Sequence, residues 1–144
     1  NRAQSLERQG KPGEALAAYT DVVGLASAQE KTEIRKEMAG LLLRHPSLAA
    51  LAEGARRHVM RAEVATQEGH FEEAVKEYRE AVKISPHYPD LYKALALNYA
   101  ELKQYRRAID ALSAYLALSP AATDARTAKD QIYKWEFVIE KGGK

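Results

Sequence analysis

The sequence contains no cysteine, which excludes disulfide bonds, thiolate metal sites and a cysteine nucleophile. It also lacks any apolar run near the roughly 18 residues of a membrane-spanning helix, so we expect no membrane span. No block of like charge occurs, and 22 basic residues nearly balance 20 acidic ones, which argues against a nucleic-acid partner. Because the chain begins at Asn1 without methionine, we expect a processed or trimmed product, and its localisation, cytoplasmic or periplasmic, is left open.

The common sequence motifs of catalysis are missing as well. There is no glycine-rich phosphate loop, no His-Glu-x-x-His, no Gly-x-Ser-x-Gly and no acidic calcium loop. The four histidines, His45, His58, His70 and His87, do not have the spacing of a standard metal site. We therefore expect no catalytic residues, no cofactor and no metal, and a chain that is not an enzyme.

An internal repeat is the strongest positive signal. Residues 68–86, EGHFEEAVKEYREAVKISP, align with residues 102–120, LKQYRRAIDALSAYLALSP, at an offset of 34 residues. The apolar positions agree and the charged ones do not. The matched pairs are Phe71 and Tyr105, Ala74 and Ala108, Val75 and Ile109, Tyr78 and Leu112, Val82 and Leu116, Ile84 and Leu118, and Pro86 and Pro120. Helical spacing over 90–102 and 105–118, with a short link between them, predicts an antiparallel helix hairpin in each unit.

This unit resembles the tetratricopeptide repeat (TPR), a helix-turn-helix of 34 residues. In one copy the match lies in Ala96, Tyr99, Tyr105, Ala108 and Pro120, and in the other in Ala62, Gly69, Phe71, Ala74, Ala81 and Pro86. Two positions depart from the family pattern, with Arg61 in place of the usual leucine and Tyr115 in place of the usual alanine. The resemblance implies an all-α fold, a right-handed superhelix (α-solenoid) of antiparallel helix pairs with a C-terminal capping helix.

The predicted organisation is a single TPR-like domain over 1–144. A weaker sequence similarity occurs at an offset of 59 residues, where Ala15 and Tyr19 align with Ala74 and Tyr78. This similarity predicts that 1–27 is a truncated repeat. The segment 28–54 is a degenerate helical region, 55–88 and 89–122 are full repeats, and 123–140 is the capping helix. We expect about seven helices and no strand.

In TPR arrays the first helices of successive units line a concave groove that holds peptides or partner proteins. The residues that project on this groove here are Arg56, Val59, Glu63 and Gln67, then Asp90, Lys93, Leu97 and Glu101, and finally Asp124, Thr127, Gln131 and Trp135. Trp135 is the candidate aromatic anchor of this groove, but packing against the cap is the favoured interpretation of this residue. The Lys and Asn clamp with which one family branch grips chaperone tails is absent, because Glu63 follows Val59 and Leu97 follows Lys93.

Three functions are compatible with this reading. The favoured one is an adaptor or scaffold that binds a peptide or partner protein in the groove. The second is a structural module that self-associates by stacking its array ends. The third is an accessory domain of a larger chain. The sequence does not identify the partner.

Overall fold

The computed structural model describes residues 1–142, and this part of the chain contains eight α-helices and no strand. The helices are α1 (Arg2–Arg8), α2 (Pro12–Val23), α3 (Ala28–Arg44), α4 (Glu53–Gln67), α5 (Phe71–Ile84), α6 (Pro89–Glu101), α7 (Tyr105–Leu118) and α8 (Ala125–Glu140), with a 3₁₀ turn, η1, at Pro46–Leu48. The predicted all-α, TPR-like solenoid is confirmed, with eight helices instead of about seven.

In each of the two full repeats, the first and second helices are joined by a tight turn that contains one residue with positive φ. Gly69 has a φ of 76° between α4 and α5, and Lys103 has a φ of 59° between α6 and α7. The backbone bonds around them repeat, because His70 donates to the Ala65 carbonyl and Gln104 to the Tyr99 carbonyl. The two units therefore share one turn geometry, which glycine adopts without steric cost and lysine does not.

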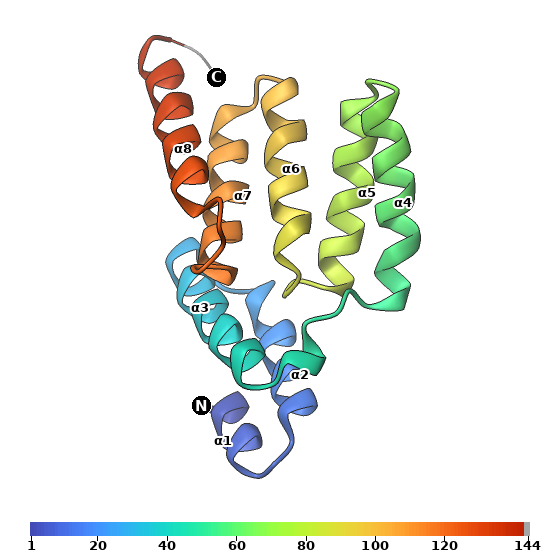
Figure 1. The fold of residues 1–144 in the computed structure, drawn as a ribbon, viewed down its shortest axis with the longest axis vertical. Helices are drawn as coiled ribbons and strands as arrows, with labels where there is room; N and C mark the ends of the chain where they lie inside the picture. The colour runs from blue at the N-terminus through green and yellow to red at the C-terminus, as the bar shows by residue number, and fades with distance from the viewer. Residues whose placement is uncertain (143–144) are drawn as a thin grey trace.

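Small side chains allow the helices to cross closely. Ala62, Ala74, Ala96 and Ala108 have no exposed surface, and the aromatic rings of the core pack around these crossings. The helices α4 to α8 form a row in which each helix packs on the next one along the chain. Figure 1 shows α4 to α8 as an upright row, with α1 to α3 gathered beneath it.

The first three helices do not continue this row. α1 and α2 form a hairpin, and α3 packs against α2 and against α7. Within the described part of the chain, α4 packs closely on α5 but not on α1, α2 or α3. The link from α3 to α4 is fixed at the α5–α6 loop, since Ala52 donates its N–H to Ser85 Oγ at 3.0 Å and His87 Nε2 lies 3.0 Å from the Ala50 carbonyl. One side of α4 is therefore left uncovered, and this explains why Arg61 can stand where the repeat usually has leucine.

Candidate protein-interaction surface

Side-chain contacts place the first helices of the row next to one another. Thr66 on α4 donates its hydroxyl to Asn98 Oδ1 on α6 at 3.2 Å, and Asn98 in turn donates to the Ala94 carbonyl. Lys93 on α6 reaches Asp124, the residue that precedes α8. The surface formed by the predicted residues of α4, α6 and α8 is called the first-helix face below.

Most of the predicted groove residues are accessible on this face. The exposed ones are Arg56, Glu63, Gln67, Asp90, Leu97, Glu101 and Thr127, and the half-buried ones are Val59, Lys93, Asp124 and Gln131. Leu97 is notable because 54% of it is exposed in the middle of α6. Acidic, basic and apolar side chains are thus mixed over this face.

Lys93 is held by two neighbours and is not a free charge. Its ammonium lies 2.6 Å from Asp124 Oδ2 and 5.7 Å from the centre of the Tyr115 ring. The Tyr115 hydroxyl donates to Asp124 Oδ1 at 2.6 Å, so three side chains form one cluster. The Lys93 hydrogen bond, followed by that of Tyr115, lowers the pKa of Asp124, while burial and the bond to Asp124 raise the pKa of Tyr115 to about 12. This contact gives Tyr115 a structural reason to replace the usual alanine of the repeat.

Trp135 is only 6% exposed. It belongs to the core together with the buried Ala128, and the partly buried Ile132 of the same helix packs against that core; α8 itself packs on α7. This burial favours the packing role of Trp135 over the anchor role.

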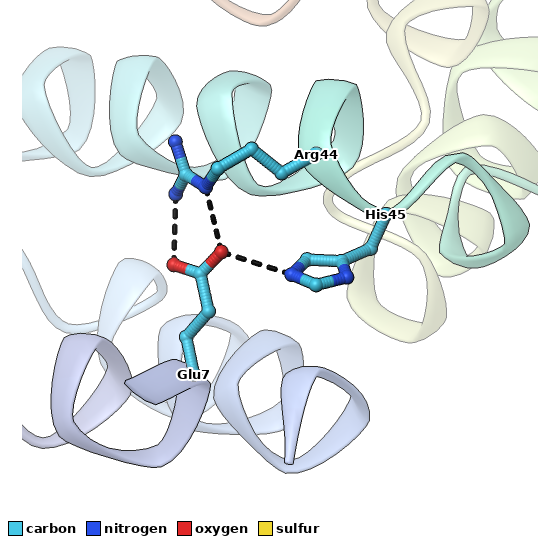
Figure 2. Close-up of polar contacts among 3 residues, drawn as sticks. All are labelled: Glu7, Arg44 and His45. Atoms are coloured by element: carbon cyan, nitrogen blue, oxygen red, sulfur yellow. Dashed lines mark hydrogen bonds and ion pairs between the residues drawn. The ribbon is translucent and has the colours of Figure 1, made fainter. Parts of the chain in front are cut away.

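A second polar cluster fixes the N-terminal helices to one another. Glu7 on α1 accepts two hydrogen bonds from Arg44, from Nε at 2.6 Å and from the terminal nitrogen at 2.8 Å, and lies 2.9 Å from His45 Nε2 (Figure 2). The Arg44 hydrogen bonds, with a smaller contribution from His45, lower the pKa of Glu7 to about 2. This cluster joins the start of the chain to the end of α3.

Two further histidines lie at the α4–α5 hairpin. His58 Nδ1 lies 2.8 Å from Glu77, and His70 is exposed in the α4–α5 turn. Residues 1–142 contain no group of three or more His, Cys, Asp or Glu side chains arranged to hold a metal ion. No helix in the same range is both long and apolar enough to cross a membrane.

Sequence reasoning missed one hollow altogether. A cleft of about 720 Å³ is lined by residues of α3, α5, α6 and α7, beside the contact between α3 and α7 and on the side of the row opposite the first-helix face. Its residues are distant in the sequence, and the repeat pattern gives no signal that α3 folds back onto α7.

The family model described as "Tetratricopeptide repeat" matches residues 61–133, which is just over half of the chain. The chain belongs to the tetratricopeptide repeat family. This family is typically non-catalytic and serves protein-protein interaction in general terms. A comparison with curated proteins found no match.

Proposed function

We propose that this TPR chain is a non-catalytic adaptor that holds a peptide, or an extended segment of a partner protein, against the first-helix face. The observation that supports this most directly is Leu97, a large apolar side chain that is 54% exposed between charged neighbours. Apolar centres with polar rims are the usual arrangement of protein-binding surfaces. The partner contributes an apolar side chain over Leu97 and polar groups toward Glu63, Asp90 and Glu101.

The experiment uses Leu97→Asp and a matched control, Leu25→Asp. Leu25 is 90% exposed in the α2–α3 loop, outside the first-helix face, so the same change there tests only added charge. Proteins captured by the full chain are compared with those captured by each variant, and any captured segment is then titrated as a synthetic peptide. We expect Leu97→Asp to lose the partner and Leu25→Asp to keep it. Equal binding by both variants would contradict the use of this face.

A second candidate, self-association through the array ends, is supported by a different observation. Met60 and Val64 are exposed on the uncovered side of α4, beside a hollow of about 490 Å³, and Tyr133 and Phe137 are exposed on α8 at the other end of the row. Head-to-tail contact between such ends would produce open stacks. Size-exclusion chromatography with light scattering decides this, because the proposal requires a mass that rises with concentration and falls in Val64→Glu.

A further inference from the structure

The cleft behind the row is bounded by α3 on one side and by α5, α6 and α7 on the other. Its volume of about 720 Å³ lies within the range of roughly 300–1,000 Å³ that is usual for ligand sites. It lies on the second-helix side of the row, so it is separate from the face proposed above and does not depend on that proposal.

The charges that line the cleft are strongly one-sided. Lys31 and Arg35 come from α3, Arg79 and Lys83 from α5, and Arg107 from α7, whereas Asp110 is the one carboxylate among residues 1–142 that lines it. Lys83 is paired with Glu80 at 3.0 Å. The other four cations have no carboxylate within 4.0 Å among the described residues. Four unpaired cations from three helices repel one another, and an anion bound between them would relieve that repulsion.

Arg35 shows the clearest need for a partner. Its guanidinium lies 5.1 Å from the centre of the Tyr92 ring, and its buried Nε–H has no hydrogen-bond partner. The Tyr92 hydroxyl, which donates to the Pro86 carbonyl at 2.8 Å, does not accept from this Nε–H. A buried donor without an acceptor is costly, and the planar guanidinium is best satisfied by a carboxylate.

The floor of the cleft helps to identify the ligand. Tyr92, Leu95 and Tyr99 are nearly fully buried, so the faces of the two tyrosine rings are not open for the stacking of nucleic-acid bases. The half-buried Val82 adds an apolar side chain to the lining, and a free inorganic anion has no apolar group to contact it. A peptide segment that carries both carboxylates and apolar side chains can contact both parts of the cleft, because its carboxylates pair with the arginines and its apolar side chains contact the apolar lining.

We propose that the cleft between α3 and α5 to α7 binds a short acidic peptide segment of a partner protein, whose carboxylates pair with Arg35, Arg79 and Arg107. Arginine is suited to this role because its fork of N–H donors matches the two oxygens of a carboxylate. Binding here would also bridge α3 to the row of repeats, and so couple the N-terminal helices to the array.

The test uses the full chain and a fluorescein-labelled peptide in which glutamate alternates with leucine and glycine, read by fluorescence anisotropy at low salt. The cleft variant is Arg79→Gln with Arg107→Gln, both exposed residues without a carboxylate partner. The matched control, Arg57→Gln with Arg126→Gln, removes the same charge from α4 and α8 at exposed positions that are not among the residues of the first-helix face. We expect the cleft variant to bind about tenfold or more weakly and the control variant to bind nearly as the unchanged chain does.

Several results would overturn the proposal. An equal loss in both double variants would mean general attraction of charge, and a loss confined to the control variant would place the peptide outside the cleft. Unchanged binding of a peptide with glutamine in place of glutamate would remove the role of carboxylates. Displacement by inorganic phosphate at the same concentration as the acidic peptide, or tighter binding of a labelled oligonucleotide, would assign the cleft to another ligand class.

The Arg35→Lys variant tests the role of Arg35 separately from the two double variants. It keeps the positive charge over Tyr92 but removes the planar fork. We expect a several-fold loss of peptide affinity with a melting temperature close to that of the unchanged chain. A folded Arg35→Lys variant with full affinity would contradict the role given to Arg35. Leu97→Asp should leave the peptide affinity unaltered, so failure of this proposal and failure of the adaptor proposal give different results.

Discussion

The ammonium of Lys93 lies 2.6 Å from the carboxylate of Asp124, and this pair connects α6 to the residue that precedes α8. The two side chains are 44% and 31% exposed, so water screens the pair in part. The Tyr115 hydroxyl donates to the other carboxylate oxygen of Asp124, Oδ1, at 2.6 Å, and so fixes the orientation of this carboxylate. The cluster lies where the capping helix joins the last full repeat.

The first prediction concerns this cluster. Lys93→Met should lower the melting temperature, and most of that loss should disappear when Asp124 is already asparagine, because the two changes remove the same interaction. Tyr115→Phe should cost about 1 kcal/mol, the net value of one hydrogen bond. Thermal unfolding of the single and double variants measures the coupling. Additive losses from Lys93→Met and Asp124→Asn would show that the pair contributes nothing.

The second prediction concerns the left-handed residue in the α6–α7 turn. Lys103 has a φ of 59° at the position where the preceding repeat has Gly69, with a φ of 76°. Lys103→Gly should stabilise the chain by about 0.5 to 1 kcal/mol, because glycine adopts this conformation without strain. Gly69→Lys should destabilise by a similar amount, since nothing within 4 Å of a Cβ there would clash and only the backbone is strained. Urea denaturation of both variants checks the opposite signs.

The repeat units were predictable because their signal is local. Apolar residues at helical spacing, alanines at the helix crossings and prolines after the second helices predict the hairpins α4–α5 and α6–α7. The predicted segment 105–118 coincides with α7. The exposure of Leu97 and the burial of Ala74 both follow from which side of a helix a residue occupies.

The position of α3 was not predictable in this way. Its amphipathic pattern indicates a helix, but the choice of α7 as its neighbour depends on the path of the link through Pro46 and on contacts at Ser85 and His87. The partners of Lys93 and Glu7 are likewise 31 and 37 residues away in the sequence. Helical periodicity carries no information about such pairs, and the basic cleft was missed for the same reason.

A third prediction follows from the lowered pKa of Glu7. A carboxylate whose pKa falls from 4.5 to about 2 on folding stabilises the native state above pH 4.5, and this contribution is lost as the pH drops toward 2. The stability difference between the unchanged chain and Glu7→Gln should therefore be constant near neutral pH and shrink in that acid window. Chemical denaturation at a series of pH values tests this, and a difference that stays constant down to pH 2 would contradict it.

The fourth prediction concerns the helix crossings. Ala74→Leu and Ala108→Leu should each destabilise by about 1–3 kcal/mol, because neither alanine has exposed surface and added methylenes force the helices apart. Ala17→Leu, at an exposed position of α2, is the matched control and should change stability little. Unchanged melting temperatures for both buried substitutions would mean that the helices are not closely packed at these crossings and tolerate added bulk.

The last prediction separates the two roles considered for Trp135. This residue is the single tryptophan of the chain and is 6% exposed, so its fluorescence reports the docking of α8. Trp135→Ala should lower the free energy of unfolding by about 3 to 5 kcal/mol through the cavity that it leaves. Trp135→Phe should cost much less, and Tyr133→Ala, at an exposed position of the same helix, should cost little. If Trp135→Ala instead left the melting temperature unchanged and abolished partner capture, the tryptophan would be a binding anchor and α8 would have to undock to present it.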